Sequence, residues 1–115
     1  MIRVEVESSK GFIRRVHVDG HGGGKKGRDI VCAAVSAVAQ TALQGLLSFA
    51  PGTIGWTRES GSLDISVRDC EDGKTRNIVQ VILATMSMGL ERIAGEHPEK
   101  VKYLSVDDPG ISDEA

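Results

Sequence analysis

A histidine and a cysteine stand on either side of a glycine- and lysine-rich segment. Residues 20–36 read GHGGGKKGRDIVCAAVS, with His21 before the segment and Cys32 after it. A thiol and an imidazole form a nucleophile and base pair when the fold brings them within about 3 Å of each other. The intervening glycines and lysines also fit a phosphate-binding loop. The segment therefore supports two hypotheses, which the surrounding elements must separate.

The residues just before Cys32 predict the start of a helix. Asp29 is a favoured N-cap residue, so the helix is expected to begin directly after it. Cys32 then lies at the third helical position, where the helix dipole and unpaired main-chain amides stabilise a thiolate. Asp29 opposes this as a like charge, but its carboxylate could orient an imidazole as the third member of a triad does. Ser36 and Gln40 continue the same helix face, which predicts a polar wall lining a site.

A second interpretation of Cys32 is structural. Buried cysteines are common and inert, and this one lies among alanines and valines. A metal site is not expected, since Cys70 and His97 fall in other elements without ligand spacing. Cys70 lies between two acidic residues that disfavour a thiolate, so it is interpreted as structural or incidental. We expect neither a metal nor another cofactor.

The glycines also match a dinucleotide-binding pattern. Gly22, Gly24 and Gly27 satisfy GxGxxG between a predicted strand and a predicted helix, where backbone amides can approach a phosphate. However, the preceding strand is the second arm of a hairpin, and about 20 positions further on stands Phe49 rather than an acidic residue. The alternative that remains is a non-catalytic module that binds an anion or RNA through the glycine loop 22–28.

Composition limits the class of protein. The chain has 115 residues, 40% of them hydrophobic, which suits one compact domain. Its formal net charge of -2 argues against dedicated nucleic-acid binding. The first residues lack the pattern of a signal peptide, and no uninterrupted apolar run approaches the roughly 18 residues of a membrane span. We therefore expect a cytoplasmic protein without membrane contact.

Hydrophobic periodicity predicts the order ββα-ββα-β. Alternating apolar residues predict one hairpin near the start of the chain and a second in its middle, each followed by a helix. The predicted ranges are a strand from residue 2, then 12–19, helix 29–49, strands 53–60 and 62–69, helix 75–94 and strand 101–106. This is the α+β class, with an antiparallel or mixed sheet and two helices in a layered sandwich. The domain is expected to span 1–106, followed by a frayed acidic tail over 107–115.

Two further expectations concern the core. Apolar residues fill most of the circumference of the first helix, which predicts that this helix is largely buried. Phe49 and Trp56 are expected to be core side chains, with a lesser possibility that they line a substrate subsite. His17 alternates with valines and is expected to lie on a strand face.

The run VDGHGGG…GRDIVCAAVSAVAQTAL resembles the ribosomal-processing cysteine protease family, called Prp. The pattern of that family is Gly-His at a strand end, a glycine-containing loop, and G-x-D-I-V-C-A-x-x-S-A on a helix. Gly20-His21 and residues 27–37 match it, and a looser likeness extends over residues 1–105. The sequence departs from the pattern at Gly22, where the family usually has Ala or Ser.

The resemblance implies a cysteine endopeptidase that removes a short N-terminal extension from large-subunit ribosomal protein L twenty-seven during ribosome assembly. The nucleophile of the family falls on Cys32 and its histidine partner, the general base and acid, on His21. Asp29 and Ser36 match motif positions with supporting roles. The resemblance also implies a homodimer and a flexible loop that moves when substrate binds. That loop comprises Gly22, Gly23, Gly24, Lys25, Lys26 and Gly27.

Overall fold

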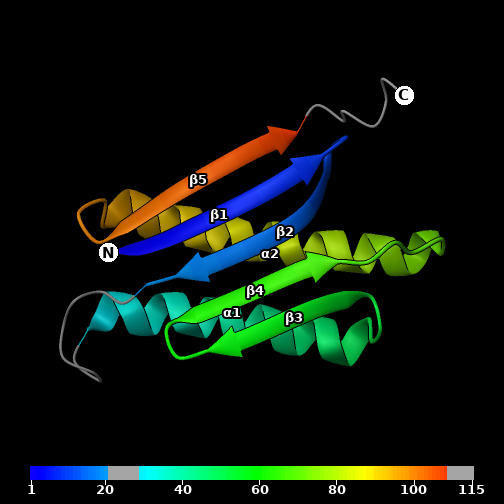
Figure 1. Ribbon diagram of the computed structural model, residues 1–115, viewed down its shortest axis with the longest axis horizontal. Helices are drawn as coiled ribbons and strands as arrows, with labels where there is room; N and C mark the ends of the chain where they lie inside the picture. Colours follow the sequence, from blue (N-terminus) through cyan, green and yellow to red (C-terminus); the bar gives the residue numbers. More distant parts are fainter. Residues whose placement is uncertain (21–28, 109–115) are drawn as a thin grey trace.

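Two helices pack on one face of a five-stranded sheet (Figure 1). The computed structural model describes residues 1–20 and 29–108. The elements in chain order are β1 (Ile2–Ser9), β2 (Phe12–Asp19), α1 (Ile30–Phe49), β3 (Ile54–Glu59), β4 (Ser62–Val67), α2 (Gly73–Glu96) and β5 (Val101–Asp108). The predicted order ββα-ββα-β and the α+β class are confirmed.

The sheet has the strand order β3-β4-β2-β1-β5. The two predicted hairpins, β1–β2 and β3–β4, are both antiparallel, and β4 joins them by pairing with β2. β5 pairs with β1 in parallel, which makes the sheet mixed. This last pairing places β5, the final strand, beside β1, the first strand of the chain (Figure 1).

Period-2 alternation sends one set of side chains from each strand toward the helices. Val4, Val16 and Ile65 are completely buried on this inner face. On the outer face, His17 lies in register with Asp64, and its Nδ1 is 3.1 Å from Oδ1 of that carboxylate. The prediction that His17 occupies a strand face is confirmed.

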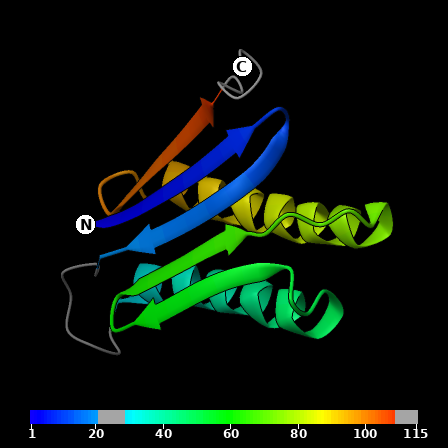
Figure 2. The ribbon, with the colours of Figure 1, turned by 45° about the vertical axis from the view of Figure 1, so that its right-hand side comes forward.

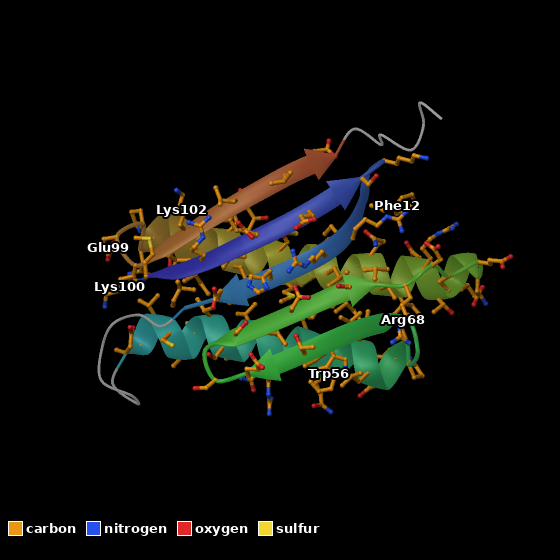
Figure 3. The ribbon with its side chains drawn as sticks, in the orientation of Figure 1. Phe12, Trp56, Arg68, Glu99, Lys100 and Lys102 are labelled. Carbon is orange, nitrogen blue, oxygen red and sulfur yellow. The ribbon has the colours of Figure 1, made fainter. Side chains whose placement is uncertain are left out.

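The prediction that α1 is largely buried is wrong. Only the side of α1 that faces the sheet and α2 is buried. Its buried residues are Val31, Val35, Ala39, Ala42, Leu43 and Leu46. Ile30 is 82% exposed and Phe49 is 71% exposed. Trp56 on edge strand β3 is 44% exposed (Figure 3). Phe49 and Trp56 are therefore not core residues. Phe49 is the last residue of α1, whose outer side no further layer covers, and Trp56 lies opposite Ile65 on an edge strand, at the border of the sheet.

Helix α2 is longer than predicted at both ends. Asp72 is its N-cap: the side chain accepts hydrogen bonds from the Lys74 N–H at 3.3 Å and the Thr75 hydroxyl at 2.6 Å. The Thr75 hydroxyl, followed by the Lys74 amide, lowers the pKa of Asp72 because both donors stabilise the carboxylate.

Strand β5 also extends two residues beyond the predicted end. Its pairing with β1 continues from Ile2–Val101 through Ser9–Asp108. Asp107 and Asp108 therefore belong to the strand rather than to the predicted acidic tail. Residues 109–115, the rest of that tail, lie outside the described residues.

Both helices are long and apolar enough, by length and composition alone, to cross a membrane. Their contacts indicate another role. α1 and α2 pack on each other, and the buried residues of each belong to the one hydrophobic core shared with the sheet. Core helices of soluble domains commonly have this composition, so the feature follows from burial against the sheet.

Candidate active site

Cys32 lies in the first turn of α1, as predicted. Its side chain is half-buried and packs against the edge of the hydrophobic core. The thiol is therefore neither fully buried, as an inert structural cysteine would be, nor fully exposed. It contacts the core but keeps part of its surface accessible. A partly exposed thiol at a helix N-terminus is the environment in which reactive cysteines occur.

Asp29 caps α1 and binds the amides around Cys32. Its Oδ1 accepts hydrogen bonds from the N–H groups of Val31 at 3.0 Å and Cys32 at 3.1 Å. Its main-chain oxygen accepts one from the Ala33 N–H at 3.0 Å. The expectation that amides near the thiol are unpaired is therefore wrong for Val31 and Cys32, because the cap already occupies them.

The second oxygen of Asp29 is the unusual atom of this site. The side chain of Asp29 is only 7% exposed, and Oδ2 is buried without a hydrogen-bond partner among the described residues. A buried carboxylate oxygen without a donor is costly. Such an atom can accept a further hydrogen bond.

A lysine from a distant part of the chain reaches the same carboxylate. Lys100 Nζ lies 4.0 Å from Asp29 Oδ1. The Lys100 backbone is fixed on both sides: its N–H donates to the His97 carbonyl at 2.9 Å, and its carbonyl accepts from the Ile2 N–H at 2.9 Å. Figure 3 shows Lys100 at the end of the molecule where α1 begins. Sequence reasoning missed this residue, since no local pattern links it to Asp29.

Strand β2 ends at this same end of the molecule (Figure 2). Gly20 closes the strand with a φ of +99°, and its N–H donates to the Gly61 carbonyl at 2.8 Å. A Cβ on Gly20 would collide with the Met1 carbonyl. The strand exit is thus fixed between the N-terminus and the β3–β4 turn, directly before the motif histidine.

The remaining predicted site residues divide into two groups. Ser36 is half-buried on α1, one turn after Cys32, and Gln40 one turn further is exposed and accepts from Arg58 Nη1 at 3.4 Å. His21 and the loop of residues 22–27 lie outside the described residues. The predicted contact between His21 and Cys32 therefore stays a prediction.

The second cysteine lies elsewhere. Cys70 is half-buried between β4 and α2, and its Sγ lies 3.6 Å from the Asp72 carbonyl. It lines a hollow of about 440 Å³ together with Phe12 and Arg76. Within residues 1–20 and 29–108, no three His, Cys, Asp or Glu side chains are grouped so that they could hold a metal ion.

The family comparison agrees with this arrangement. The family model described as "Cysteine protease Prp" matches residues 1–102, which include α1 with its cap and the strand exit at Gly20. The chain belongs to the Prp family of cysteine proteases. It is therefore a peptidase, and the resemblance drawn from the residues around Cys32 is confirmed.

Curated and solved members of the Prp family are similar over nearly their whole length. The ribosomal processing cysteine protease Prp of Staphylococcus aureus is 34% identical over 107 residues, which cover 89% of this chain and 96% of that protein. The crystal structure of Prp from S. aureus with a covalently linked product peptide has a TM-score of 0.80 at 28% identity, covering 91% of this chain and 99% of that chain.

A second solved structure gives the same fold. SMU.848 from Streptococcus mutans has a TM-score of 0.79 at 28% identity, covering 94% of this chain and 96% of that chain. A further S. aureus Prp structure contains a substrate peptide, with a TM-score of 0.76 at 26% identity. The Prp fold thus binds peptides in at least one relative.

Proposed function

We propose that this protein is an endopeptidase that removes the N-terminal extension of large-subunit ribosomal protein L twenty-seven. Cys32 is the nucleophile, and His21 is the general base and acid. The observation that carries the proposal is the half-buried Cys32 in the first turn of α1, beside a buried carboxylate, in a chain of the Prp family. The ribosomal processing named for the S. aureus relative supports the substrate class.

The proposed reaction passes through a thioester. His21 accepts the thiol proton of Cys32, and the thiolate attacks the carbonyl carbon of the scissile peptide bond. When the C–N bond breaks, the imidazolium of His21 protonates the leaving amine. Water, deprotonated by the same imidazole, then attacks the thioester, which releases the N-terminal fragment as a carboxylic acid and restores the thiol.

Asp29 and Ser36 support this pair in the proposed scheme. The buried Oδ2 of Asp29 is the acceptor for the imidazole N–H of His21, which fixes the tautomer and orientation of the base. Ser36 forms part of the polar wall one turn beyond Cys32. The amides of Val31 and Cys32 are bound to Asp29, so they hold the oxyanion only if that carboxylate turns away.

The glycine loop is the part of the proposed site that covers the bound substrate. We assign Gly22, Gly23, Gly24, Lys25, Lys26 and Gly27 to a flexible segment that closes over the extended substrate and excludes water. The protein acts in the cytoplasm, where ribosomal proteins are assembled, and works as a homodimer. Exposed apolar side chains on the helices, which include Leu47, Val81 and Met88, supply surface for such an association.

The intact mass of the ribosomal protein, with its extension, tests the proposal after incubation with this chain. Native protein and the Cys70→Ala variant should give one truncated product, whereas Cys32→Ala and His21→Ala should leave the mass unchanged. Cys70→Ala is the matched control, since it removes the other half-buried thiol. An unchanged mass with folded native protein would contradict the proposed substrate, and cleavage by Cys32→Ala would contradict the nucleophile.

A further inference from the structure

We propose that Lys100 is a positioning residue for the reaction: its ammonium group offsets the buried negative charge of Asp29 and so favours the thiolate of Cys32. The inference rests on the proposed function only in the role given to Cys32. It adds a residue from the connection between α2 and β5, which lies outside the motif around the cysteine.

The placement of Lys100 comes from its backbone. The hydrogen bond to the His97 carbonyl ties it to the C-cap of α2, and the hydrogen bond from the Ile2 N–H ties it to the first residue of β1. The side chain then extends to within 4.0 Å of Asp29 Oδ1 while remaining 44% exposed. The parallel pairing of β5 with β1 therefore delivers a cation to the start of α1.

The charge balance at this end explains why a cation is needed. Asp29 Oδ1 accepts from the Cys32 amide, so its negative charge lies one hydrogen bond from the backbone of the nucleophile. A carboxylate there opposes the formation of a second negative charge on the thiol. It is also almost fully buried, and a buried charge requires compensation. Among the described residues, Lys100 is the cationic side chain that the structure places within 4.0 Å of this carboxylate.

Other charged groups lie at the same end of the molecule. Glu99 is paired with His97, with Oε2 and Nδ1 4.0 Å apart, so this neighbouring carboxylate has its own partner. The N-terminal amine of Met1 lies at the same end of the sheet (Figure 1). Lys102, two residues along β5, is exposed and belongs to the outer face of the sheet, away from α1 (Figure 3).

The test measures how fast iodoacetamide alkylates Cys32 across pH. All variants carry Cys70→Ala, so that Cys32 is the one thiol in the chain. Lys100→Gln should slow alkylation at pH 7 by about three-fold and displace the rate profile toward higher pH, because the negative charge of Asp29 is then no longer offset. Lys100→Arg should keep the native profile. Lys102→Gln is the matched control with the same change in charge and should leave the rate unchanged.

A double-variant comparison shows whether Lys100 acts through Asp29. In an Asp29→Asn background, Lys100→Gln should change the alkylation rate by less than about 1.5-fold, since there is no carboxylate left to offset. An equal slowing in both backgrounds, or no slowing by Lys100→Gln alone, would overturn the proposal. So would an equal effect of Lys102→Gln. Circular dichroism before each assay ensures that only folded variants are compared.

These outcomes are separate from those of the proposed function. Alkylation requires a reactive thiol but no peptide cleavage. A chain that fails to cut the ribosomal protein, yet shows the Lys100 effect through Asp29, would contradict the substrate and leave this inference standing. A chain that cuts the ribosomal protein, yet shows no effect of Lys100→Gln on alkylation, would contradict this inference and leave the proposed substrate standing.

Discussion

Asp29 serves two purposes at the scale of single residues. Its Oδ1 satisfies two amides of the first turn of α1, which stabilises the helix. Its Oδ2 is buried and has no donor among the described residues, which suits an acceptor for a catalytic imidazole. One oxygen thus contributes to folding, and the other is the acceptor for His21 in the proposed mechanism.

Two substitutions of Asp29 should separate these purposes. Asp29→Ala removes the cap and should lower the free energy of unfolding by about 1–2 kcal/mol. Asp29→Asn keeps an oxygen that can cap the helix, so it should cost less than half as much. Both should lower kcat/KM for cleavage at least about ten-fold, because the imidazole loses its charged acceptor. Urea unfolding and steady-state kinetics give the two quantities. Wild-type kcat/KM in Asp29→Asn would contradict the catalytic role.

The element that leads into the site is the end of β2. Gly20 has a φ of +99° and lies against the Met1 carbonyl, whereas Gly11 has a φ of +82° with open space around it. Both positions favour glycine because L-residues are strained there. Only Gly20 also lacks room for a side chain, so the strand exit is specified by conformation and by packing together.

Alanine substitution should distinguish the two glycines. Gly11→Ala should lower the free energy of unfolding by about 1 kcal/mol, the cost of the backbone conformation alone. Gly20→Ala should cost about 2–4 kcal/mol, because the added methyl group must also displace the backbone at Met1. Urea denaturation measures both. Equal losses for the two variants would show that the close approach at Gly20 does not hold the strand exit.

The start of α2 should be sensitive to acid. The pKa of Asp72 is lowered by the Thr75 hydroxyl and then by the Lys74 amide, so the folded state holds the carboxylate more readily than the unfolded chain does. A group with a lowered folded pKa stabilises the protein above its unfolded pKa, which for an aspartate is about 3.9. That contribution is lost as the pH falls through the folded pKa.

The difference between native protein and Asp72→Ala should therefore depend on pH. Native protein should have the higher melting temperature at pH 7, and the gap should narrow steadily below about pH 4. Thermal unfolding followed by circular dichroism from pH 2 to pH 7 measures this difference. A gap that stays constant over that range would mean that the charge of Asp72 does not stabilise the helix.

At the scale of the whole molecule, local patterns were enough to predict the elements but not all of their contacts. The N-cap at Asp29, the two hairpins and both helices follow from spacing within a few residues. The parallel pairing of β5 with β1 and the approach of Lys100 to Asp29 depend on packing between distant segments. No local period contains that information.

The sequence also could not predict how exposed single side chains are. Phe49 and Trp56 are large and apolar, which favours the core, yet both are exposed, because Phe49 ends α1 and Trp56 lies on an edge strand. The extra residues of α2 were missed because Asp72-Gly73 fits a turn and an N-cap equally well. Tertiary contacts decided each of these cases.

Assembly is a property of the whole molecule as well. The proposed homodimer should have twice the 12.2 kDa mass of one chain in light scattering behind size exclusion, at micromolar concentration. The exposed apolar side chains of α1 and α2 would be partly covered in such a dimer. A mass equal to one chain across that concentration range would contradict the homodimer.

The role of Cys32 as nucleophile is the central claim, and one measurement tests it most directly. Iodoacetamide is added to native protein, and samples are taken for peptide mass mapping of both cysteines and for cleavage of the ribosomal precursor. Cleavage activity should disappear at the rate at which Cys32 is alkylated, whatever the state of Cys70. Activity that persists once Cys32 is fully alkylated would contradict the role given to this thiol.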